Sequence, residues 1–95
     1  MKRTWIKDAV TGQPVLIQGF VERIRNTRYM AFLVLRDRSG TLQLTIEKGL
    51  HPEWENLLEQ ITVESVVSIE GVIQENPQVK LGGRELIPTG INTES

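Results

Sequence analysis

The chain has 95 residues, no cysteine, a single histidine and a formal net charge of −1. This length favours one small domain, and the sequence contains no apolar run long enough for a membrane span, no signal-peptide pattern and no basis for a disulfide framework. With His51 alone and no thiol, it also lacks the residues for a structural zinc site or a cysteine nucleophile. We therefore expect a cytoplasmic protein that binds no metal and no other cofactor.

The N-terminal part predicts a lead-in segment followed by a long strand. Residues 1–14 indicate a short helical or irregular segment in which Trp5 and Ile6 pack on the body of the domain. Residues 15–25 are apolar on both faces and contain Gly19, a pattern typical of a strongly bent strand with a bulge or sharp coil. Strands of this kind close small barrels.

The next two strands flank a turn signal at Asp37-Arg38-Ser39-Gly40. This turn predicts three cross-strand pairs, which are Arg36 with Thr41, Val34 with Gln43, and Phe32 with Thr45. Because side chains alternate between the two faces of a strand, one face takes the apolar set to the core. Its members are Ala31, Leu33, Leu35, Leu42, Leu44 and Ile46. The opposite face then carries an exposed phenylalanine next to polar side chains.

A second hairpin precedes this one. If residues 26–29 form its loop, Arg25 pairs with Met30 and Arg23 pairs with Phe32, so both arginines join the outer face. A β-bulge in the first strand would break this register.

The charge is divided unevenly along the chain. Residues 1–48 hold nine Lys and Arg against four Asp and Glu, a balance of +5, whereas residues 49–95 hold two against eight, a balance of −6. Such asymmetry favours a basic surface that binds phosphates, particularly because arginines share a predicted face with Phe32. The acidic charges of the second half are those of an ordinary solvated surface.

The second half predicts a helix and two strands. Residues 52–61 have apolar side chains at helical spacing, and Pro52 suits the first helical position. Residues 64–73 return to strand alternation, and a last strand near residues 84–87 is limited by Pro88.

The order of elements predicts the fold class. It is all-β with a small α content: a five-stranded Greek-key OB-fold barrel with a helix between strands three and four, whose binding surface lies on strands two and three. We expect residues 1–95 to form a single domain, with the barrel at 15–92.

Several segments together resemble a known family. The chain is similar to the N-terminal anticodon-binding OB domain of class II aspartyl, asparaginyl and lysyl tRNA synthetases, and most similar to archaeal-type aspartyl enzymes. The matching segments are Gly19-Phe20-Val21, Arg23-Ile24-Arg25, residues 31–38, Gly40-Thr41-Leu42-Gln43, Glu64-Ser65-Val66-Val67, Gly71, Gly82-Gly83 and Glu85. They cover nearly the whole chain, and their joint spacing makes the signal specific.

The resemblance implies a nucleic-acid-binding site. In that family a strand-two phenylalanine stacks on the central anticodon base, a strand-three glutamine hydrogen-bonds its edge, and an arginine lies close by; these positions are Phe32, Gln43 and Arg25. The acidic residue that contacts the third anticodon base corresponds to Glu85. Four further basic residues are weaker candidates for RNA contacts: Arg23, Arg28, Arg36 and Lys48.

The chemistry of these side chains agrees with the implied roles. An exposed ring such as Phe32 can stack on any unpaired base, so it gives affinity without choice. Gln43 offers a donor and an acceptor and can read a base edge, while an ionised Glu85 can only accept, which favours a base with an exocyclic amine such as cytosine. Each of these residues can also be an ordinary surface or partner-covered side chain.

No catalytic residue is expected in this chain. It has no phosphate-binding glycine loop, nucleophile elbow or metal-ligand cluster, and the resemblance implies that catalysis belongs to a separate class II domain. The expected partner is a tRNA anticodon loop of the aspartate type, with asparagine possible. The chain is then a domain excised from an aspartyl-tRNA synthetase, in which a catalytic domain or homodimer partner adjoins it, or a free-standing relative. Two other functions stay open: a generic single-strand binder and a protein-docking OB module.

Overall fold

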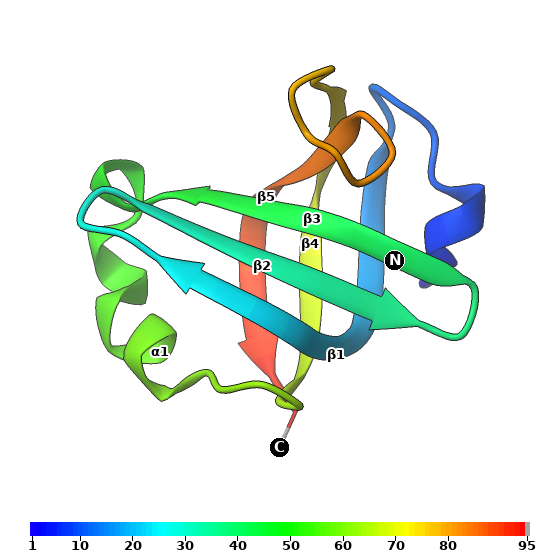
Figure 1. Ribbon diagram of the computed structural model, residues 1–95. Coiled ribbons are helices and arrows are strands. Elements are labelled where there is room, and N and C mark those ends of the chain that lie inside the picture. Colours follow the sequence, from blue (N-terminus) through cyan, green and yellow to red (C-terminus); the bar gives the residue numbers. More distant parts are fainter. Residues whose placement is uncertain (95) are drawn as a thin grey trace.

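The computed structural model describes residues 1–94, which fold into a closed barrel with strand order β1-β2-β3-β5-β4 (Figure 1). Its strands are β1 (Pro14–Asn26), β2 (Met30–Asp37), β3 (Gly40–Glu47), β4 (Val66–Glu75) and β5 (Arg84–Thr93). The helical elements are η1 (Ile6–Asp8), η2 (Lys48–Leu50), η3 (Pro52–Trp54) and α1 (Glu55–Gln60). The predicted five-stranded barrel with a helix between its third and fourth strands is confirmed.

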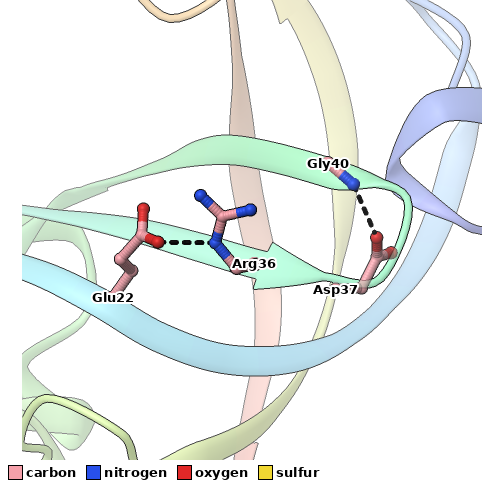
Figure 2. A network of polar contacts seen from close by, with 4 residues as sticks. All are labelled: Glu22, Arg36, Asp37 and Gly40. Carbon is pink, nitrogen blue, oxygen red and sulfur yellow. Dashed lines mark hydrogen bonds and ion pairs between the residues drawn. The ribbon is translucent and has the colours of Figure 1, made fainter.

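The predicted pairing of β2 with β3 is also confirmed. Arg36 lies opposite Thr41, Val34 opposite Gln43 and Phe32 opposite Thr45. The carboxylate of Asp37 closes this hairpin, because its Oδ1 accepts a hydrogen bond from the backbone N–H of Gly40 at 3.2 Å (Figure 2) and another from the backbone N–H of Ser39 at 2.7 Å. The apolar set of the two strands is buried in the barrel as the alternation predicted.

The predicted pairing of β1 with β2 is wrong by two residues. Arg25 lies opposite Phe32 and Arg23 opposite Val34. The cause is a tighter turn than the sequence indicated: the Thr27 N–H donates to the Met30 carbonyl at 2.8 Å, and the Met30 N–H donates to Thr27 Oγ1 at 3.1 Å. A shift of two residues preserves the face of every side chain, so both arginines still share the face of Phe32.

The first strand is bent and bulged, as its composition indicated. The bulge lies between Val21 and Arg23, where Glu22 is the extra residue. Gly19 serves a different purpose, because a Cβ atom there would lie 2.4 Å from the carbonyl oxygen of Arg36. The glycine therefore lets β1 cross β2 at close range.

The last strand is longer than predicted. We expected Pro88 to limit it, but β5 continues through Pro88 to Thr93. Gly71 pairs with Pro88 and Glu70 with Gly90, so Thr89 forms a bulge next to the proline. Proline is tolerated in a sheet at such a bulge because the ladder hydrogen bonds are interrupted there.

The core fills the barrel and both flanks. Ile17, Leu33, Leu44 and Leu86 are at most 1% exposed, and Ile6 is buried from the lead-in segment as predicted. The predicted helix at residues 52–61 begins as the 3-10 turn η3 and becomes α-helical only at Glu55. Its apolar stripe does face the core: Leu58 and Ile61 are buried, and Trp54 and Leu57 pack against them. No helix among residues 1–94 is long and apolar enough to cross a membrane.

Candidate nucleic-acid interface

A groove runs over the outer face of β1, β2 and β3 and is closed on one side by the connection between β4 and β5. Its volume is about 920 Å³. The four leading candidates from the sequence all line it, although each comes from a different strand: Arg25 from β1, Phe32 from β2, Gln43 from β3 and Glu85 from β5. The barrel thus brings together side chains that lie up to 60 positions apart in the chain.

Arg25 and Phe32 form a cross-strand pair on this face. They are directly opposite in the β1–β2 ladder, and the Arg25 guanidinium carbon lies 5.3 Å from the centre of the Phe32 ring. This distance is within the range of a cation–π interaction. Phe32 is half-buried, so its ring is a fixed platform rather than a mobile side chain.

Gln43 lies between the aromatic platform and the far wall of the groove. It pairs with Val34 on β2 and, through the parallel β3–β5 contact, with Glu85. Its Nε2 donates to Thr45 Oγ1 at 3.0 Å, which orients the amide. An amide has two N–H groups and one carbonyl oxygen, so Gln43 retains one donor and an acceptor for a ligand.

Glu85 is held in place by a residue that sequence reasoning missed. Its side chain is only 4% exposed, and its Oε2 accepts a hydrogen bond from Asn76 Nδ2 at 2.8 Å. Asn76 is in turn fixed by the turn it begins, since its N–H donates to the Gly83 carbonyl at 2.9 Å and its Oδ1 accepts from the Gln78 N–H at 3.1 Å. The sequence signalled only a loop at Asn76-Pro77, with nothing to connect it to Glu85.

The four weaker candidates lie in three places. Arg23 lines the groove. Arg28, at the tip of the β1–β2 hairpin, and Lys48, at the start of η2, lie outside the groove and line a small hollow beside α1. There the Arg28 guanidinium lies 5.3 Å from the Tyr29 ring, and Lys48 Nζ donates to the Thr27 carbonyl at 2.6 Å.

Arg36 lies at the other end of β2 and is paired with an acid. Its Nε donates to Glu22 Oε1 at 2.5 Å across the β1 bulge (Figure 2). This hydrogen bond, with smaller contributions from the charges of Arg36 and Arg23, lowers the pKa of Glu22 from its ordinary value. The same hydrogen bond, with the charge of Glu22, raises the pKa of Arg36. Both side chains are solvent-exposed, so the pair holds the geometry of the bulge weakly.

Within residues 1–94, no group of three or more His, Asp or Glu side chains is arranged to hold a metal ion. What the groove offers is an aromatic platform, an oriented amide, a fixed carboxylate and two arginines. This set can stack an unpaired base and hydrogen-bond its edge.

Comparison with known proteins gives a family match and several relatives. The model of the tRNA_anti-codon family, described as an OB-fold nucleic acid binding domain, matches residues 15–93. The aspartate–tRNA(Asp/Asn) ligase of Methanopyrus kandleri is 36% identical over 99 residues, covering 95% of this chain and 23% of the ligase. The aspartate–tRNA(Asp) ligase of Thermococcus kodakarensis is 36% identical over 87 residues, covering 90% of this chain and 20% of the ligase.

A solved structure agrees with the fold. The asparaginyl-tRNA synthetase of Pyrococcus horikoshii, complexed with asparaginyl-adenylate, superposes with a TM-score of 0.89 at 20% identity and covers 100% of this chain and 23% of that one. The chain therefore spans between a fifth and a quarter of the length of these relatives.

Proposed function

The chain belongs to the tRNA_anti-codon family of OB-fold nucleic acid binding domains, and on this basis we propose that it recognises the anticodon loop of a tRNA. Its relatives include aspartate–tRNA and asparagine–tRNA ligases. We propose residues 1–95 as a single binding domain of that kind of enzyme or of a free-standing relative. In either case it acts in the cytoplasm, where tRNA is charged.

The observation that carries this proposal is the convergence of Arg25, Phe32, Gln43 and Glu85 on one groove. Phe32 stacks on the central base of the anticodon, and Arg25, directly opposite it in the β1–β2 ladder, neutralises a nearby phosphate or contacts the same base. Gln43 reads the edge of that base. Its amide is oriented by the hydrogen bond that its Nε2 donates to Thr45 Oγ1. Stacking supplies affinity, and the amide supplies choice.

Glu85 reads the third anticodon base in this proposal. Asn76 occupies its Oε2, which leaves Oε1 to accept from an exocyclic amine, the pattern that cytosine presents. A base with a carbonyl at that place would meet a carboxylate oxygen and be disfavoured. The relatives differ here, since one is a ligase for tRNA(Asp) and another for tRNA(Asp/Asn), so Asp-type recognition is proposed with Asn-type recognition as the variant to test.

The chain does not carry out aminoacylation by itself in this proposal. Its sequence contains no nucleophile elbow and no phosphate-binding glycine loop, so its proposed contribution to a ligase is recognition. A class II catalytic domain would supply the chemistry, and a dimer in the full-length enzyme would bring two such domains to two tRNA molecules.

Binding to RNA hairpins that carry anticodon loops tests the proposal. We expect affinity that falls steeply with salt and falls further when the central base is changed. Two rival functions give different results: equal affinity for unrelated single strands would indicate a generic single-strand binder, and an absence of binding even at low salt would indicate a protein-docking module. Either result would overturn anticodon recognition.

A further inference from the structure

A second cluster of cationic and aromatic side chains lies outside the groove. The guanidinium carbons of Arg3 and Arg38 lie 4.1 Å and 4.7 Å from the centre of the Trp5 ring. We call these three residues the Trp5 cluster. Arg3 also donates to the Gln18 carbonyl, so the cluster is tied to β1 as well as to the β2–β3 turn. No role in the groove accounts for this arrangement, and the resemblance of the chain to its family assigned it none.

The Trp5 cluster continues the track of outward side chains on β2. Phe32, Val34 and Arg36 point outward in succession; Val34 lines the groove with Phe32, and Arg36 lines a second hollow with Arg3, Trp5 and Arg38. At about 3.3 Å per residue, Arg36 lies about 13 Å from Phe32 along the strand. With its central base on Phe32, the anticodon extends only one nucleotide to either side. The cluster therefore lies beyond the reach of the anticodon itself.

The charge of this surface fits a polyanion. Arg3, Arg36 and Arg38 are exposed. Two of the acids beside them are engaged, since Glu22 pairs with Arg36 (Figure 2) and both oxygens of Asp37 accept hydrogen bonds. The third acid, Asp8, lines a hollow with Trp5 and Arg38, and Lys7 in the same hollow offsets its charge. Within residues 1–94, Arg38 makes no hydrogen bond or ion pair, so its five N–H donors remain for a ligand. Stacking on the indole restricts each guanidinium without using those donors.

We propose that the Trp5 cluster, with Arg36, is a second contact surface for the same RNA, where it binds phosphates of the nucleotides that flank the anticodon. The inference rests on the proposed function. Phosphate contacts of this kind position an RNA without reading its sequence. Two half-exposed apolar residues, Phe20 and Val66, also line the hollow. If this surface bound a protein rather than RNA, the partner would contact these two residues.

The test compares a double variant with a control of equal charge. Arg3→Gln with Arg38→Gln removes two positive charges from the cluster; Asn56→Asp with Gln60→Glu changes the net charge by the same two units on exposed positions of α1. The probe is an RNA hairpin with a cognate anticodon loop, titrated between 50 and 200 mM salt. A further variant, Arg3→Lys with Arg38→Lys, keeps the charge and should retain most of the binding.

The expected result is a shallower salt dependence. Losing two phosphate contacts makes the slope of log affinity against log salt less steep by about 1.4–1.8. The factor by which the variant loses affinity is therefore about tenfold larger at 50 mM salt than at 200 mM salt. The preference for the central base should be unchanged. An unaltered slope in the glutamine variant, or an equal effect of the α1 control, would overturn the second surface while the parent still binds its cognate hairpin. Failure of the parent to bind any hairpin would overturn the proposed function and this inference together.

Discussion

Replacing the buried Asp37 by asparagine should destabilise the protein strongly. Its carboxylate is 6% exposed and accepts four hydrogen bonds: Oδ2 from the Ile6 N–H at 2.8 Å, and Oδ1 from the Ser39 N–H, the Ser39 hydroxyl and the Gly40 N–H at 2.7, 2.6 and 3.2 Å. In Asp37→Asn, an amide oxygen facing the turn leaves Nδ2 facing the Ile6 N–H, donor against donor.

The size of the effect follows from this geometry. An unpaired N–H at a buried site costs about 1–3 kcal/mol, and the other three bonds lose the strength that a charged acceptor gives them. We expect a loss of about 2–4 kcal/mol in the free energy of unfolding, which for a domain of this size lowers Tm by at least about 8 °C. Asp8→Asn is the matched control, because Asp8 is exposed, and it should change stability by less than about 0.5 kcal/mol.

The pH dependence gives a second readout of the same contact. Burial works to raise the pKa of Asp37, but the hydrogen bonds from Ser39, Ile6 and Gly40 outweigh it, and the pKa lies below the ordinary value of 3.8. The stabilising effect of the carboxylate is therefore complete above that value and is lost as the pH falls through the lowered pKa. The free energies of urea unfolding of the parent and Asp37→Asn should differ most near pH 7 and converge as the pH falls well below 3.8. Equal stabilities at pH 7 would refute the reasoning.

Three further changes test other parts of the structure. Gly19→Ala should cost about 1–3 kcal/mol in urea unfolding because of its backbone clash, whereas Gly49→Ala, which meets no atom within 4 Å, should be close to neutral; equal effects would show that β1 and β2 can separate. Glu22→Gln releases Arg36 from its ion pair and should tighten RNA binding at low salt but not at high salt; a gain that persists at high salt would contradict an electrostatic origin. Asn76→Ala should relax selectivity at the third anticodon base in binding assays, because the buried carboxylate of Glu85 loses its hydrogen-bond partner. Unchanged selectivity would show that Glu85 does not read this base.

Much of the groove could be predicted because its signals are local. The turn at Asp37-Arg38-Ser39-Gly40 fixes the pairing of β2 with β3, and strict alternation then determines that Phe32 and Gln43 point away from the core. The error in the pairing of β1 with β2 was a shift of two residues, so every side chain of β1 was still assigned to the correct face of the sheet. The sequence therefore predicted correctly that Arg25 shares a face with Phe32, although it did not predict that the two residues lie directly opposite each other.

The rest depends on contacts between distant parts of the chain. Glu85 comes beside Gln43 because β5 pairs with β3 in parallel when the barrel closes, and no local pattern predicts that closure. The bond from Asn76 to Glu85 and the bond from Ile6 to Asp37 join residues of different loops and strands. The same holds for the two arginines over Trp5, which are 35 positions apart in the sequence. Such contacts become visible only when the elements are assembled in three dimensions.

The most direct test of the central claim is the affinity of three proteins for four RNA hairpins. The hairpins carry a cognate anticodon loop with each of the four bases at the central position, and the proteins are the parent, Phe32→Ala and Gln43→Ala. Phe32→Ala should weaken binding to all four by about 1–3 kcal/mol, a factor of about 5 to 150, because stacking is insensitive to the base. Gln43→Ala should weaken the cognate hairpin and leave the other three nearly unchanged. If both variants bound all four hairpins as the parent does, the groove would not be the surface that reads the anticodon.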